Sequence, residues 1–143
     1  MVLNQIARFL PQFFKAPGAI GAVAPSSQGL ARRMVEWIDW PQVQAVVEYG
    51  PGTGVFTGSI VASMRPDARF FAIEINTTFY ESLTKSFPTA RIYNDSVENV
   101  EALCTKEGME KVDAVICGLP WASFSKSAQS RFIGKATSLP PKP

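Results

Sequence analysis

The sequence predicts an α/β domain with a parallel sheet, because short apolar runs alternate with helical patterns over most of its 143 residues. That length suffices for one domain with a buried core, and 46% of the residues are hydrophobic. Strands separated by helices pair in parallel through right-handed crossovers. We therefore expect a sheet flanked by helices.

Two helices are expected before the sheet. Apolar residues recur at spacings of three and four over residues 2–14, which predicts an amphipathic helix. Residues 16–25 are rich in Gly and Pro, which predicts an ordered loop. Ser26 and Ser27 are then expected to cap the start of a second helix over residues 28–38.

Strands and helices should alternate through the rest of the chain. The predicted strands are residues 45–48, 69–74, 90–94 and 112–117. The predicted helices are residues 55–64, 77–86, 97–106 and 125–138. Each apolar run is short and bounded by turn residues, which is typical of buried strands. Pro140 and Pro141 should end the last helix.

Composition excludes several kinds of chemistry. The chain has no histidine, and its two cysteines form no Cys-x-x-Cys pair, so we expect no histidine catalysis and no metal site. Isolated thiols suit a reducing cytoplasm. Residues 1–35 and 114–143 each hold four basic residues and no acidic one, whereas all twelve acidic residues lie between them. Such cationic ends favour an anionic partner, either a membrane surface or nucleic acid.

A glycine-rich loop separates the first predicted strand of the sheet from the next helix. This glycine loop comprises Gly50, Pro51, Gly52, Thr53 and Gly54. Glycine permits positive φ angles and a close approach of a ligand to the backbone. The loop lacks the lysine of a P-loop, and Val55 and Thr57 stand where a dinucleotide fingerprint has its last glycine. We expect a ligand of another kind here rather than a bare turn.

Acidic residues at the ends of the next two strands favour a nucleoside ligand. Glu74 ends the second strand, where a carboxylate can accept both ribose hydroxyls, and a solvated strand end is the alternative. Asp95 follows the third strand and can accept the amino group of an adenine. Asp95 or Ser96 can also cap the next helix, and these two roles are compatible.

Together these segments resemble the motifs of class I S-adenosylmethionine-dependent methyltransferases. The matching segments are residues 48–54, 74, 94–96 and 117–121. Within that superfamily the chain is similar to bacterial phospholipid N-methyltransferases, which are relatives of the ribosomal RNA adenine dimethyltransferases. The narrower resemblance rests on residues 14–17, 21–27 and 118–121. The whole resemblance covers residues 9–139.

The resemblance implies a Rossmann-like methyltransferase domain over residues 28–143. Residues 1–27 would form an amphipathic helix and a loop that faces the substrate or a membrane. The implied cofactor is S-adenosylmethionine, bound by Glu48, Gly50, Gly52, Gly54, Glu74, Ile75, Asp95 and Ser96. Among these, Glu48 and the glycines would line its methionine part, Glu74 would hold the ribose, and Asp95 with Ser96 would contact the adenine. The acceptor amine would face Gly118, Leu119, Pro120 and Trp121, with Tyr49 as a weaker candidate base.

The implied function is N-methylation of a phospholipid head group, on the route from phosphatidylethanolamine to phosphatidylcholine. Two alternatives stay open: methylation of an RNA adenine or a small amine, and cofactor binding without turnover. The RNA dimethyltransferases resemble Asn-Leu-Pro-Tyr where this chain has Gly118 and Trp121, which weakens the nucleobase interpretation. The ring of Trp121 would either attract the substrate cation or pack in the core.

A domain without turnover is an alternative because few strands are predicted. A class I methyltransferase sheet usually has more strands than the four predicted here, so we expect truncation after strand four and its following helix. The open edge of strand four would then favour self-association. Residues 1–15 are expected either to bind an anionic membrane surface or to pack over the sheet. No transmembrane span is predicted. The thiols favour a cytoplasmic location, and the amphipathic, cationic residues 1–15 favour a peripheral position on the inner membrane face.

Overall fold

Four parallel strands form the centre of the computed structural model, which describes residues 25–119 and 125–130. The strands are β1 (Ala45–Tyr49), β2 (Arg69–Ile73), β3 (Arg91–Tyr93) and β4 (Ala114–Cys117). Their order in the sheet is β3-β2-β1-β4, and every neighbouring pair is parallel. In this register Val47 of β1 is level with Phe71 of β2 and with Val115 of β4. The predicted parallel sheet is confirmed.

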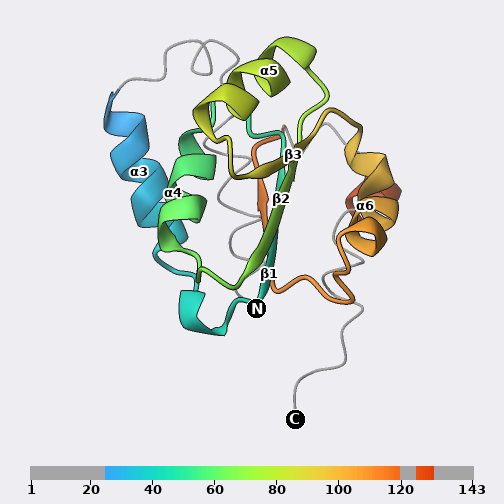
Figure 1. The fold of residues 1–143 in the computed structure, drawn as a ribbon, viewed down its shortest axis with the longest axis horizontal. Helices are drawn as coiled ribbons and strands as arrows, with labels where there is room; N and C mark the ends of the chain where they lie inside the picture. The colour runs from blue at the N-terminus through green and yellow to red at the C-terminus, as the bar shows by residue number, and fades with distance from the viewer. Residues whose placement is uncertain (1–24, 120–124, 131–143) are drawn as a thin grey trace.

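Helices cover both faces of this sheet (Figure 1). Those on one face are α3 (Pro25–Val35), α4 (Val55–Ser63) and α5 (Thr77–Ser86). Those on the other are the 3₁₀ turn η2 (Val97–Asn99), α6 (Val100–Lys106) and the helical residues 126–130. A further 3₁₀ turn, η1 (Trp40–Gln42), leads into β1. The described residues therefore form three layers with the sheet in the middle.

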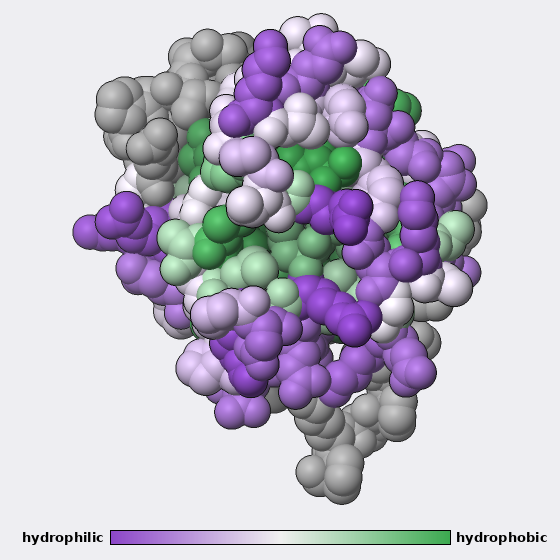
Figure 2. All heavy atoms as spheres, viewed as in Figure 1, coloured by the Kyte–Doolittle hydropathy of each residue, from purple (hydrophilic) through white to green (hydrophobic). Residues whose placement is uncertain are grey.

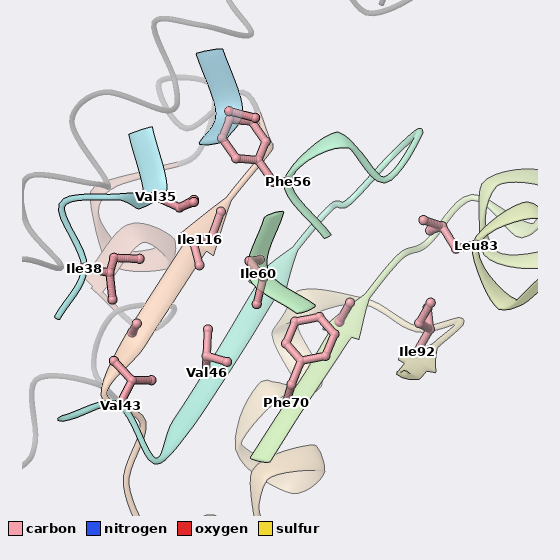
Figure 3. Close-up of a cluster of buried hydrophobic side chains, with 13 residues drawn as sticks. Val35, Ile38, Val43, Val46, Phe56, Ile60, Phe70, Leu83, Ile92 and Ile116 are labelled. Atoms are coloured by element: carbon pink, nitrogen blue, oxygen red, sulfur yellow. The ribbon is translucent and has the colours of Figure 1, made fainter. Parts of the chain in front are cut away.

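Alternate residues of the strands build a hydrophobic core on each face. Val46 and Ile116 pack toward α3 and α4, against Phe56 and Ile60 (Figure 3). Val47 and its counterparts on β2 and β4 pack toward α6 instead. Strands buried on both faces read as continuous apolar runs, which is why the sequence pattern revealed them. In the view of Figure 2, hydrophilic residues surround a smaller apolar area.

The observed helices differ from the predicted ones at three places, the first being that α3 ends at Val35 rather than at residue 38. Helix α3 begins at Pro25, so Ser26 and Ser27 lie inside it and the prediction that they cap a helix is wrong. Proline suits the first helical position, because its φ angle is fixed near the helical value and it lacks an N–H that would stay unpaired there. The single helix predicted over residues 97–106 is divided into η2 and α6.

Several predictions concern residues outside the described ranges. These include the amphipathic helix over residues 2–14 and the end of the helix over residues 125–138. Within the described ranges, no helix is both long and apolar enough to span a bilayer. The same part of the chain contains no cluster of His, Cys, Asp or Glu side chains suited to a metal ion. Strand β4 lies at one edge of the described sheet, as expected. The self-association predicted for this edge stays a prediction.

Asp113 fixes the start of β1 against β4. Its Oδ2 accepts hydrogen bonds from the backbone N–H groups of Gln44 at 2.8 Å and Ala45 at 3.0 Å. The N–H of Asp113 donates in turn to the Ala45 carbonyl at 2.8 Å. One carboxylate therefore continues the pairing of the two strands before β4 begins.

We expect Asp113→Ala to lower the free energy of unfolding by about 3 kcal/mol, because it removes two hydrogen bonds to a charged group and each contributes about 1.5 kcal/mol at the lower end of the usual range. Urea denaturation of the variant and the wild-type chain measures this loss. Asp67→Ala is the matched control, since Asp67 forms a surface ion pair in which its Oδ2 lies 2.6 Å from Arg65 Nη2. The control should lose less than about 1 kcal/mol, as exposed ion pairs do. Equal losses in the two variants would contradict the anchoring role.

Candidate cofactor site

The carboxyl ends of the four strands meet at one end of the sheet. The chain order reverses at β1, which lies between β2 and β4. In open α/β sheets, ligands bind in the crevice outside the carboxyl ends of the strands at such a switch point. The glycine loop follows β1 at this end, whereas Glu74 follows β2, Asn94 follows β3 and Gly118 follows β4. The structure thus brings together the segments that the sequence singled out.

The glycine loop has a backbone conformation that other residues rarely adopt. Gly50, Gly52 and Gly54 have φ angles of 64°, 57° and 88°, and only glycines have positive φ in the described part of the chain. The Gly50 N–H donates to the Ile73 carbonyl at 2.9 Å, so the loop begins while still paired with β2. None of the described atoms lies within 4 Å of the position that a Cβ would take on Gly52. That side of the loop is therefore open to a ligand.

The Glu74 carboxylate links the glycine loop to the turn that follows β2. Its Oε1 accepts a hydrogen bond from the Gly52 N–H at 2.8 Å, and its Oε2 accepts one from the Asn76 N–H at 2.9 Å. The residue is only 5% exposed, so the alternative of a solvated strand end is wrong. Each carboxylate oxygen has two lone pairs, which leaves acceptor capacity for ribose hydroxyls. Neighbouring Ile75 is 70% exposed and presents an apolar side chain to solvent.

Asp95 and Ser96 hold the turn before η2. The Asp95 Oδ1 accepts hydrogen bonds from the Ser96 N–H and from the Asn99 side-chain amide, both at 2.7 Å. The Ser96 hydroxyl accepts a hydrogen bond from the Glu98 N–H at 3.2 Å, so Ser96 is the N-cap. The capping role predicted for this pair is confirmed for Ser96. Contact with an adenine stays a prediction for both residues.

Glu48 is a buried carboxyl group bonded to helix α4. It is 1% exposed, and its Oε1 accepts a hydrogen bond from the Thr57 hydroxyl at 2.5 Å. Burial is the main reason that the pKa of Glu48 rises from 4.5 to about 8; the Thr57 hydrogen bond opposes this rise, and the Glu74 charge adds to it. The carboxyl is therefore largely protonated at neutral pH. The sequence did not predict this role of Thr57, because there position 57 was considered only as lacking the last glycine of a dinucleotide fingerprint.

Tyr49 belongs to the hydrophobic core rather than to an exposed catalytic position. It is 1% exposed and packs in the cluster that faces α6. Burial raises its pKa above the ordinary value for a tyrosine, with the nearby Cys104 and Cys117 as smaller causes. Because burial favours the neutral phenol, the structure argues against Tyr49 as a base.

The end of β4 lies close to the end of β1 and to the first residue of the glycine loop. The Gly118 N–H donates to the Tyr49 carbonyl at 2.8 Å. A Cβ added at Gly118 would lie 2.5 Å from the carbonyl oxygen of Gly50, and a Cβ added at Gly50 would lie 2.3 Å from Leu119 Cδ2. This close approach gives a physical reason for glycine at position 118. Pro120 and Trp121, the other predicted acceptor-site residues, lie outside the described ranges.

We expect Gly118→Ala to lower the free energy of unfolding by about 1–3 kcal/mol, since overpacking against a fixed backbone displaces both partners. Chemical denaturation measures the loss. Gly29→Ala is a matched control, because no described atom lies within 4 Å of a Cβ at that position of α3. Alanine is favoured over glycine in a helix by about 1 kcal/mol, so the control should gain stability. A gain in both variants would show that position 118 has room for a side chain.

Comparison with solved structures identifies the fold. The chain is similar to the O-methyltransferase TomG from Streptomyces achromogenes, solved in complex with SAM, with a TM-score of 0.61 and 16% identity. That match covers 94% of this chain and 60% of TomG. The chain therefore shares the fold of this methyltransferase, a parallel sheet between layers of helices, as the resemblance of its motifs implied.

Two curated relatives are similar in sequence. The ornithine lipid N-methyltransferase of Singulisphaera acidiphila is 36% identical over 124 residues, which are 85% of this chain and 65% of that protein. The tRNA1(Val) (adenine(37)-N6)-methyltransferase of Shewanella halifaxensis is 25% identical over 105 residues, 71% of this chain and 41% of that protein. The chain thus spans less than two thirds of the length of each. No family model matches it.

Proposed function

We propose that the chain binds S-adenosylmethionine at the carboxyl ends of β1, β2 and β3. The observation that carries this proposal is the Glu74 carboxylate, which is buried and bonded at 2.8 Å to the N–H of Gly52 in the glycine loop. It sets an acceptor for ribose hydroxyls beside a loop whose glycines let a ligand approach the backbone. The solved neighbour TomG, with the same fold, was obtained in complex with SAM.

The residues at this end of the sheet suit each part of the cofactor. The open side of Gly52 leaves space near the loop for the methionine part. The free lone pairs of Glu74 suit the ribose, and the exposed side chain of Ile75 offers an apolar surface to the adenine. Asp95 lies on the adjacent turn, where the predicted contact with the adenine amino group would form.

We further propose that the acceptor is a lipid head-group amine. Bound S-adenosylmethionine would supply an activated methyl group to a neutral amine, with S-adenosylhomocysteine as the leaving group and a proton passing from the product ammonium to water. The chain's own residues then need to align the amine and exclude water, and neither task requires a histidine. Gly118 and Leu119 follow β4 beside the glycine loop, and their backbone carbonyls are the proposed partners of the amine. The name of the relative at 36% identity supports a lipid acceptor.

Methylation of an adenine in RNA is the second candidate. The relative at 25% identity is named as a tRNA adenine methyltransferase, which favours this alternative. Glycine at position 118 weighs against this candidate, because the RNA dimethyltransferases resemble Asn-Leu-Pro-Tyr here and this chain lacks the asparagine amide. The carbonyl of Gly50 lies so close to Gly118 that it leaves no room for such a side chain. An anionic membrane surface, met through residues 1–15, stays a prediction about residues outside the described ranges.

Two measurements on the full chain test these proposals. Calorimetric titration with S-adenosylmethionine should show saturable binding, and its absence would overturn the cofactor proposal. Transfer of a radiolabelled methyl group is then compared among vesicles of phosphatidylethanolamine, vesicles of ornithine lipid, and adenine-containing RNA. Label in either lipid supports the lipid proposal and distinguishes the two head groups. Label in RNA alone supports the second candidate, and binding without any transfer supports a domain without turnover.

A further inference from the structure

Asn94 is a polar residue of the site to which the proposed function gives no role. It directly follows β3, and the preceding residue, Tyr93, accepts a hydrogen bond from the Glu74 N–H at 2.9 Å. Ile73 and Tyr93 are the last paired residues of β2 and β3, and this bond adds one more connection from the next residue, Glu74. Asn94 therefore stands where the two strands stop and their loops begin.

The side chain of Asn94 continues the connection between these loops. Its Nδ2 donates to the Glu74 carbonyl at 3.0 Å and to the Ile75 carbonyl at 3.2 Å. Its Oδ1 accepts a hydrogen bond from the hydroxyl of Thr77, the first residue of α5, at 3.3 Å. A primary amide is the side chain that offers two donor hydrogens and an acceptor from one planar group. One residue thus joins the end of β2, the start of α5 and the end of β3.

We propose that Asn94 is a positioning residue, which holds residues 74–76 so that Glu74 and Ile75 face the cofactor. The part of this inference that concerns the cofactor rests on the proposed function. Asn94 bonds to the backbone carbonyls of both residues, and the Glu74 carboxylate on the same turn receives the Gly52 and Asn76 N–H groups. Because the Ile75 side chain is 70% exposed, packing restrains it little and hydrogen bonds must supply the restraint.

The chemistry of the contact separates asparagine from residues of similar size. Aspartate at position 94 would place a carboxylate oxygen against the carbonyl oxygens of Glu74 and Ile75, which repel it. Alanine would remove the hydrogen bonds without adding repulsion. Asn94→Asp should therefore disturb the turn more than Asn94→Ala, the reverse of the order expected if size alone mattered.

Amide hydrogen exchange tests the role without any cofactor. The Gly52 and Asn76 N–H groups both donate to the Glu74 carboxylate. In Asn94→Ala we expect their exchange to accelerate by about tenfold, the effect of losing about 1.4 kcal/mol of local stability. Exchange of the Gly118 N–H, bonded to Tyr49 at the same end of the sheet, should stay unchanged. Equal acceleration at all three positions, or none at Gly52 and Asn76, would overturn the proposal.

Titration with S-adenosylmethionine tests the consequence for the cofactor. We expect the dissociation constant to rise about tenfold in Asn94→Ala and further in Asn94→Asp, with little change in thermal midpoint. Thr77→Val, which removes one hydrogen bond to Asn94, should give a smaller rise. Thr84→Val is its matched control, because the Thr84 hydroxyl donates to the Glu81 carbonyl within α5.

The two measurements fail in different ways. If the wild-type chain does not bind S-adenosylmethionine, the proposed function is wrong, and hydrogen exchange still decides whether Asn94 holds the turn. If Asn94→Ala and Asn94→Asp bind the cofactor as tightly as the wild-type chain does, the positioning role is wrong. A rise in dissociation constant that is equal in Thr77→Val and Thr84→Val would also contradict it.

Discussion

Glu74→Gln is expected to weaken S-adenosylmethionine binding by about 100-fold. The two ribose hydroxyls would lose their hydrogen bonds to a charged acceptor, which together contribute about 3 kcal/mol or more. Both oxygens of the native carboxylate accept backbone hydrogen bonds, from Gly52 at 2.8 Å and from Asn76 at 2.9 Å. An amide would turn an N–H donor toward one of these donors, at a residue that is only 5% exposed. Either Gly52 or Asn76 would lose its hydrogen bond to residue 74, and the ribose would lose its charged acceptor.

Calorimetric titration of Glu74→Gln and the wild-type chain measures this loss. Glu81→Gln is the matched control, since Glu81 is an exposed carboxylate on α5, the helix after the same turn. The control should bind the cofactor as the wild-type chain does. If Glu74→Gln also retained native affinity, the carboxylate would have no part in binding and the site would have to lie elsewhere.

Glu48→Gln is expected to remove a pH dependence of stability. The native chain keeps the Glu48 proton up to a pKa of about 8, whereas an ordinary glutamate loses it near 4.5. Between these pH values the unfolded state binds fewer protons, so the free energy of unfolding falls as pH rises. The stabilising contribution is complete below pH 4.5 and lost above pH 8, and it amounts to about 5 kcal/mol at about 1.4 kcal/mol per pH unit.

Denaturant titrations between pH 4.5 and pH 9 test this expectation. Glutamine keeps an oxygen that can accept the Thr57 hydrogen bond and carries no charge to bury, so the variant should be more stable than the wild-type chain at the alkaline end. Exposed Glu81 again provides the control, since Glu81→Gln should leave the slope of stability against pH unchanged. Parallel curves for the wild-type chain and Glu48→Gln would show that the buried carboxyl does not titrate as the structure indicates.

The strands and the glycine loop could be predicted because their signals are local. A short apolar run bounded by turn residues identifies β1 wherever its neighbours lie. Alternate glycines directly after a strand likewise predict a ligand loop without knowledge of strand order. The resemblance to methyltransferase motifs then placed Glu74 and Asp95 in one site, and the structure brings both to the same end of the sheet.

The contacts that shape the site could not be predicted because they join distant segments. Thr57 donates to Glu48 because α4 folds back over β1, and no periodicity in the sequence signals that pair. Glu74 reaches Gly52 because β1 and β2 are neighbours, which depends on strand order. Glycine is needed at position 118 because the carbonyl of Gly50 lies so close. The sequence alone showed Gly118 only as a departure from the Asn-Leu-Pro-Tyr motif of the RNA dimethyltransferases.

The close approach of Gly118 to Gly50 also limits which substitutions this end of the sheet can accept. The contact is made by main-chain atoms of both segments, so no choice of side chain tunes it. A library that varies residues 50 and 118 would mostly sample chains with a damaged sheet end. Substitutions meant to alter the proposed site would therefore best begin at residue 119, whose side chain lies against Gly50, and would leave the glycine loop unchanged.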